Sequence, residues 1–166
     1  MTDREFFIKT VESELPRFER VMKAIPETNA EFRPDAKSKT AAELAAYMVM
    51  DASGLPPALT EGTIDIATFF SPIPKKSAQT SAGELAALLT ATKEAAEKMS
   101  EEEWNTGKAN MTQDGKSIWD STKGAMVWGF LLDLIHHRGQ LSTYIRPMGG
   151  KVPSIYGPSA DHPDVA

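Results

Sequence analysis

The sequence predicts a single all-α domain spanning residues 1–166: a four-helix bundle with a long crossover and an extended C-terminal tail rich in Gly and Pro. At the starts of three predicted helices the chain places Ser or Thr three residues before Glu, a pattern that caps helix N-termini. Apolar residues also recur at three- and four-residue steps, which is the spacing of a helix face turned towards a core. A further segment, residues 125–135, is apolar on every side, as expected for a helix buried on most of its circumference.

The first predicted helix begins after Thr2, which forms the first of these capping pairs with Glu5. Pro16 lies inside this helix and is expected to kink it, because proline removes a backbone donor and crowds the preceding turn. The apolar stripe that should face the core consists of Phe7, Val11, Leu15, Phe18, Met22 and Ile25.

The second predicted helix begins at the pair Thr40 and Glu43. It is expected to end near Gly54, because the following Pro56 and Pro57 cannot continue a helix without losing donors.

The third predicted helix begins at the pair Ser81 and Glu84 and runs over about residues 82–99. A short capped turn is expected to follow it, from Ser100 to Trp104.

Irregular segments connect these helices. Residues 54–80 contain four prolines and are expected to cross the surface, with residues 63–70 as a candidate strand or packed apolar stretch. Residues 105–120 contain the turn dipeptide Asp114-Gly115, which predicts at most a brief hairpin. The fourth helix covers about residues 122–148, and the Gly- and Pro-rich tail after it is expected to lie on the bundle.

Composition excludes several classes of function. The 18 basic and 23 acidic residues give a net charge of −5, without the basic excess that binding to nucleic acid or acidic membranes requires. The absence of cysteine rules out disulfides and thiolate chemistry, and it favours a cytoplasmic protein. Three charges in the first five residues do not fit a signal peptide, and no run is long enough to span a membrane. Motifs for serine nucleophiles and nucleotide binding are also lacking.

The candidate site residues of the fourth helix are Asp133 and His137. Asp133 is the one charged residue in residues 125–135, and His137 follows one helical turn later on the same face, whereas His136 is turned about 100° away. A carboxylate and an imidazole at this spacing can chelate a divalent cation, but they also form a common helix-stabilising pair. If Asp133 is buried, it needs a partner: protonated His137, Arg138 or a metal.

The second helix carries a drifting polar stripe of Glu43, Tyr47 and Asp51, which faces either the fourth helix or water. Glu43 already has a capping role. A half-buried tyrosine usually contributes its ring to the core and its hydroxyl to one hydrogen bond. The stripe by itself therefore favours a structural role.

Residues 133–161 resemble the C-terminal signature of the DinB/YfiT-like family. The match is specific in HHRGQL, residues 136–141, and in PMGGKVPSIYGPS, residues 147–159. Residues 40–48, TAAELAAYM, look like the family helix that carries its first metal ligand. The resemblance implies a four-helix bundle, often dimeric, with a divalent metal held by three histidines.

Carried over residue by residue, these ligand positions fall on Tyr47, Asp133 and His137. The resemblance therefore implies a metal-dependent enzyme of hydrolase or thiol-dependent transferase type with a degenerate site. Its expected cofactor is one divalent ion, Zn or Ni first, and its expected partner is a small-molecule ligand. The alternative is a metal-free bundle that serves as a binding or dimerisation module.

A homodimer is also expected from the residues themselves. The apolar run through Trp128 and Phe130 covers more of the helix circumference than one bundle needs to bury. Such a surplus commonly packs against a symmetric partner.

Overall fold

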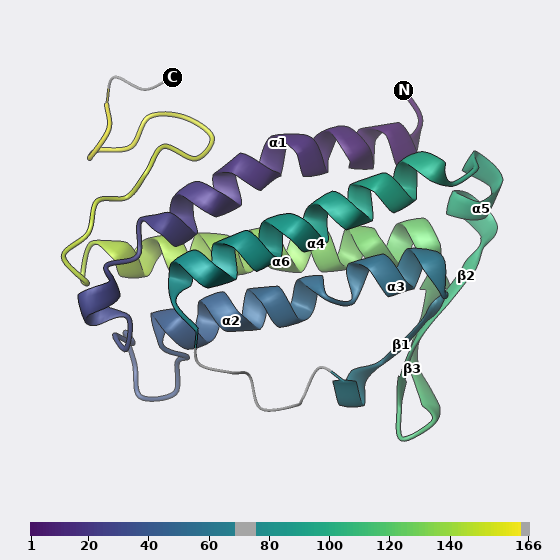
Figure 1. The fold of residues 1–166 in the computed structure, drawn as a ribbon, viewed down its shortest axis with the longest axis horizontal. Helices are drawn as coiled ribbons and strands as arrows, with labels where there is room; N and C mark the ends of the chain where they lie inside the picture. The colour runs from purple at the N-terminus through teal and green to yellow at the C-terminus, as the bar shows by residue number, and fades with distance from the viewer. Residues whose placement is uncertain (69–75, 164–166) are drawn as a thin grey trace.

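The computed structural model describes residues 1–68 and 76–163. In this part of the chain the long helices lie side by side, with α1 packed against α4 and α6, and α2 packed against the same two helices (Figure 1). Their bounds are α1 Asp3–Lys23, α2 Ala41–Ala52, α4 Ala78–Lys98 and α6 Lys123–Ile145. None of the described helices is both long enough and apolar enough to cross a membrane.

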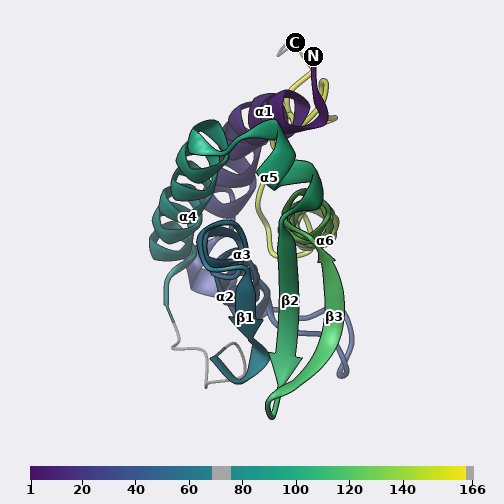
Figure 2. The ribbon, with the colours of Figure 1, turned by 90° about the vertical axis from the view of Figure 1, so that its right-hand side faces the viewer.

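A three-stranded sheet projects from one end of these helices (Figure 2). Its order is β1-β2-β3, with β1 parallel to β2 and β2 antiparallel to β3. The strands are β1 Thr63–Asp65, β2 Lys108–Gln113 and β3 Lys116–Thr122. The protein is therefore mostly helical, and the all-α prediction is wrong.

The turn between β2 and β3 explains this difference. Asp114 has φ 51° and Gly115 has φ 73°, so both central residues occupy the left-handed region. Two such residues form the turn whose twist matches a two-residue hairpin, and Asp-Gly is among the sequences best suited to it. The weak hairpin signal in the sequence thus marks a complete pair of strands.

The first two capping predictions are confirmed. Thr2 and Glu5 bond reciprocally at the start of α1, and Thr40 and Glu43 do so at the start of α2. Pro16 lies inside α1, as expected. The predicted stripe of α1 reaches the core, where Leu15 is partly buried and Phe7, Val11, Phe18, Met22 and Ile25 are buried.

The third capping prediction is wrong. Helix α4 begins at Ala78, and the hydroxyl of Ser77 accepts a hydrogen bond of 3.1 Å from the backbone N–H of Thr80. Ser81 lies one turn inside the helix and is buried. Ser77 caps the helix instead of Ser81, because Ser77 lies where the backbone is still extended.

The proline pair also behaves differently from the prediction. Pro56 and Pro57 lie in the first turn of a further helix, α3 (Leu55–Thr60), rather than in an irregular crossover. The first-turn N–H groups of a helix have no partner within it, so proline costs little there. Leu55 and Leu59 are buried as a result.

The remaining connections are short elements. Strand β1 accounts for part of the predicted apolar stretch 63–70. Residues 69 and 70, the last two of that stretch, lie outside the described residues. A 3₁₀ turn, η2 (Ile66–Thr68), follows β1, and another, η1 (Glu27–Asn29), follows α1. The turn predicted at Ser100 is helix α5 (Glu101–Thr106).

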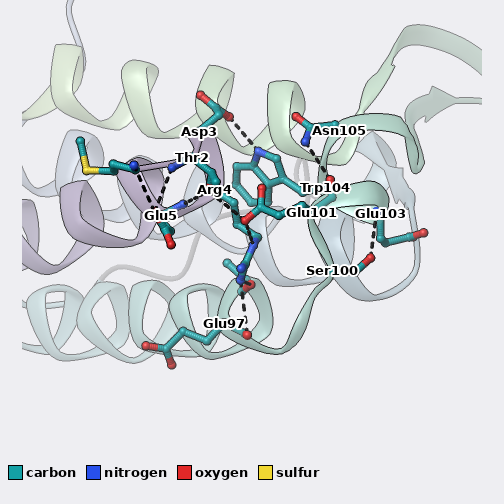
Figure 3. A network of polar contacts seen from close by, with 12 residues as sticks. Thr2, Asp3, Arg4, Glu5, Glu97, Ser100, Glu101, Glu103, Trp104 and Asn105 are labelled. Atoms are coloured by element: carbon teal, nitrogen blue, oxygen red, sulfur yellow. Dashed lines mark hydrogen bonds and ion pairs between the residues drawn. The ribbon is translucent and has the colours of Figure 1, made fainter.

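The start of α1 is tied to α5 and α6 by a polar network (Figure 3). The Asp3 carboxylate accepts hydrogen bonds from the indoles of Trp104, at 2.7 Å, and Trp128, at 3.2 Å. Arg4 donates to Glu101 at 2.7 Å and to the Ala96 carbonyl at 2.9 Å. These contacts join the start of α1 to α4, to α5 and, through Trp128, to α6.

Candidate functional site

The contact between α2 and α6 brings the predicted site residues together. The rings of Tyr47 and His137 meet edge to face, with centroids 4.9 Å apart and an interplanar angle of 80°. On α6, Asp133 Oδ2 lies 3.2 Å from His137 Nε2. Tyr47, Asp133 and His137 thus form one cluster, as the sequence predicts.

The two ring nitrogens of His137 have different neighbours. Nδ1 lies 3.2 Å from Gln140 Oε1, and the Gln140 amide donates to the Tyr144 hydroxyl, also at 3.2 Å. With the Gln140 amide in this orientation, Nδ1 faces an acceptor oxygen, and Nε2 faces the Asp133 carboxylate.

Asp133 is not buried, so the condition under which it would need a charged partner does not apply. Its side chain is 46% exposed, whereas that of His137 is 17% exposed. Arg138 is not its partner, because the guanidinium points to α1, where it pairs with Glu14. Asp133 reaches water at the edge of the helices, so the pair with His137 is only partly protected from solvent.

Asp51 is the buried carboxylate of this cluster. It is 8% exposed, and its Oδ2 finds no hydrogen-bond partner within the described residues. Burial, and after it the negative charge of Asp133 across the helix contact, raise the pKa of Asp51 from 3.8 to about 7. Asp51 therefore lies on the side of α2 that faces α6. The i, i+4 spacing from Tyr47 places Asp51 on the same face of α2, but it does not show that this face is buried.

Glu43 is the first residue of that stripe. It caps Thr40 and lies 3.6 Å from an Arg33 nitrogen. The capping role predicted for Glu43 is thus confirmed, whereas Asp51 of the same stripe is buried.

Tyr47 is held as a neutral phenol. Burial raises its pKa above 10, and the charges of Asp51 and Asp133 raise it too. The ammonium of Lys39 lies 4.8 Å from the centre of its ring. Near neutral pH Tyr47 can thus offer a hydroxyl to a ligand, but not a phenolate.

The described residues contain no ready-made trio of His, Cys, Asp or Glu that could hold a metal ion. His136 does not complete one, because it is exposed, although its ring centre lies 5.1 Å from that of His137. The cluster instead consists of a carboxylate and an imidazole on α6, a buried carboxylate on α2 and a neutral phenol beside them.

Comparison with known proteins supplies the family. No curated protein matches the chain. The fold is similar to the crystal structure of a DinB-like protein from Bacillus subtilis, with 19% identity, 90% of this chain and 96% of that chain covered, and a TM-score of 0.68. It is also similar to a DinB-like protein from Bacillus cereus, with 19% identity, 92% and 97% coverage, and a TM-score of 0.69. The model of the DinB family matches residues 6–164, and the chain therefore belongs to the DinB family.

Proposed function

We propose that the cluster between α2 and α6 binds one divalent cation, and that the protein is a metal-dependent member of its family. The observation that carries this proposal is Asp51. Its buried Oδ2 finds no partner among the described residues, and it lies in the field of a second carboxylate, Asp133. A cation between the two carboxylates neutralises their repulsion and gives the buried oxygen a partner.

The donor set supports the same assignment. Asp133 and His137 offer a carboxylate and an imidazole, and Asp51 would have to turn towards them to add a second carboxylate, because the described residues hold no preformed trio. Such donors suit Zn, Ni, Mn and Fe. The hydrogen bond of His137 Nδ1 to Gln140 leaves Nε2 for the ion, which is how ligating histidines are usually oriented. Tyr47, the remaining position of the family ligand set, contributes a neutral hydroxyl beside the ion.

A bound ion at this site would polarise a small-molecule ligand or lower the pKa of a water molecule. Both chemistries fit the hydrolase and thiol-dependent transferase types that the family resemblance suggests. Near neutral pH Asp51 can also hold a proton, because its pKa is about 7.

Added metal is expected to raise the melting temperature, because the ion binds only the folded chain. At an ion concentration 100 times Kd, the stabilisation is about 2.7 kcal/mol. Differential scanning calorimetry with Zn²⁺, Ni²⁺, Mn²⁺ and Fe²⁺ measures this effect. Asp133→Ala should abolish it while costing the metal-free protein less than about 1 kcal/mol, because the Asp133–His137 pair is half-exposed.

His136→Ala is the matched control, because it removes an exposed imidazole next to the cluster and should leave the metal response intact. If none of the four ions changes the melting temperature at saturating concentration, the metal proposal is overturned.

The variant Tyr47→His tests the geometry across α2 and α6. An imidazole at this position adds a nitrogen ligand opposite Asp133 and His137, giving two histidines with carboxylates. We expect the affinity for Zn²⁺ and Ni²⁺ to rise at least tenfold, equivalent to about 1.4 kcal/mol. Calorimetric titration measures it. An unchanged affinity would mean that position 47 does not face the ion.

A second proposal concerns self-association, the alternative role for this fold. Phe130 is buried, so it is not available to a partner. Leu132 is 59% exposed on the outer face of α6, and Trp128 of the same helix lies 5.6 Å from the ring of Phe6, which is 51% exposed. Trp119 continues this surface, since its ring lies over Gly129. We propose that a second copy of the chain covers this face.

We therefore expect a homodimer in sedimentation experiments at micromolar concentration. Leu132→Glu should shift the species to the 18.1 kDa monomer, because a carboxylate would be desolvated at the centre of the contact. Thr143→Glu, which adds the same charge to an exposed position further along α6, is the control. A wild-type monomer would contradict the proposal.

A further inference from the structure

A buried ion pair links α1 and α6 on the side of the molecule away from α2. Glu14 is 4% exposed and Arg138 is 2% exposed, and Arg138 Nη1 donates to Glu14 Oε2. Removing two charges from water is costly unless the pair is well bonded, and Arg138 Nε has no acceptor among the described residues. The stability of the ion pair thus depends on the residues that keep water away from it.

Part of that cover is the C-terminal segment. The Tyr156 hydroxyl accepts from Arg138 Nη2 at 2.5 Å and donates to Glu14 Oε2 at 3.1 Å. The Tyr156 ring also lies 5.0 Å from the guanidinium carbons of both Arg17 and Arg138. The rest of the side chain is open to solvent, since Tyr156 is 67% exposed.

The other attachments of this segment are largely polar. Arg17 donates to the Ile155 carbonyl at 3.0 Å, and Arg20 donates to the Ser154 carbonyl at 3.2 Å. Asp161 accepts from the backbone N–H of Val152 at 2.8 Å and from Arg146 at 2.9 Å. The segment is thus held by side chains of α1 and of the end of α6, near which it runs in Figure 1.

Little apolar burial adds to these bonds. Of the described residues after Met148, none is buried, and Val152 and Ile155 are only partly packed on the core. Gly149 precedes the segment with φ 88°, a conformation that glycine adopts without strain and that turns the chain away from α6. Segments with few buried apolar contacts and exposed hydrogen bonds open at a lower free energy than the core.

We propose that residues 150–163 form a strap that opens as one unit over the Glu14–Arg138 pair while the helices stay folded, with Tyr156 as its latch. Closing excludes water from the ion pair, and opening hydrates it. Arg138 directly follows His137 on α6, but its guanidinium points to α1, so the strap covers the ion pair and not the proposed metal site. The strap itself does not depend on metal.

Amide hydrogen exchange by NMR on the full chain tests this proposal. The bonded amides of Val152, Ser159, Asp161 and His162 should exchange at a common rate, about a hundredfold faster than the slowest amides of α1 and α6. Tyr156→Phe should speed the strap amides about tenfold and leave α4 unchanged, because it removes a hydroxyl bonded to two charged groups.

Asp161→Asn, which is distant from the ion pair, should also speed the whole strap. Ser142→Ala is the matched control, because that hydroxyl bonds only to the Gly139 carbonyl within α6, at 2.7 Å. Strap amides that exchange together with α1 and α6, with the same denaturant dependence, would overturn an independent strap. Unchanged rates in Tyr156→Phe would overturn its role as latch.

Discussion

Replacing Glu14 by alanine is expected to lower the free energy of unfolding by about 3 to 5 kcal/mol, because it leaves the buried Arg138 guanidinium without its counter-charge. Arg138 would keep the Tyr156 hydroxyl and the ring of Phe18, which lies 4.8 Å from its guanidinium carbon. Neither replaces a carboxylate. Urea unfolding near pH 7 measures the loss.

The double variant Glu14→Leu with Arg138→Met tests whether stability depends on the two charges or on the volume that the two side chains fill. Replacing both charges by apolar side chains of similar size is often neutral or stabilising, so the double variant should be far more stable than Glu14→Ala. If Glu14→Ala lowers the free energy of unfolding by less than about 0.5 kcal/mol, water reaches the ion pair and the pair is not buried.

Replacing Asp51 by asparagine is expected to stabilise the metal-free protein by about 2 to 4 kcal/mol at pH 8, because it removes a buried charge that repels Asp133. A carboxyl group whose folded pKa is about 7, against 3.8 when exposed, keeps its proton in the folded chain while the unfolded chain loses it. Stability therefore falls as the pH rises from about 4 to 7 and is level above that range.

The difference in free energy of unfolding between Asp51→Asn and the wild-type protein should thus be small at pH 4 and grow to its full value at pH 8. Denaturant unfolding at several pH values measures it. With saturating metal the order should reverse, since the wild-type carboxylate then has a cation and asparagine is a poorer ligand. A difference that does not change with pH would show that Asp51 is ionised throughout.

The helices could be predicted from the sequence because their signals are local. The capping pairs at Thr2 and Thr40 involve residues three apart, and the apolar stripe of α1 repeats every turn. The serine at position 81 misled the prediction, because Ser77 offers an equivalent cap one turn earlier. Local rules list the candidates for a cap, whereas packing selects one of them.

The sheet and the buried charges depend on distant contacts. Strand β1 pairs with β2 through Ile64 and Met111, which are far apart in the sequence, and neither short strand has a pattern that singles out its partner. The Glu14–Arg138 pair has one signal in the local sequence, because each charged residue interrupts an apolar helix face. Glu14 lies between Val11 and Phe18 in α1, and Arg138 lies between Leu134 and Leu141 in α6.

The site was predicted only in part for a similar reason. The spacing of Asp133 and His137 on α6 could be read from periodicity, and the family resemblance led to Tyr47. The burial of Asp51 could not be read, because a polar residue at i+8 on a drifting stripe can face either water or a neighbouring helix. Only the packing of α2 on α6 decides between the two.

The metal content of the full chain tests the central claim most directly. Protein purified without an affinity tag, saturated with Zn²⁺, Ni²⁺ or Mn²⁺ near pH 7.5 and freed of excess ion, should carry about one ion per chain by elemental analysis, as a single site requires. The Asp51→Asn and Asp133→Ala variants, treated in parallel, should carry far less, and His136→Ala should match the wild-type protein. Equal metal content in all four proteins, or none in any, would contradict the assignment of this cluster as a metal site.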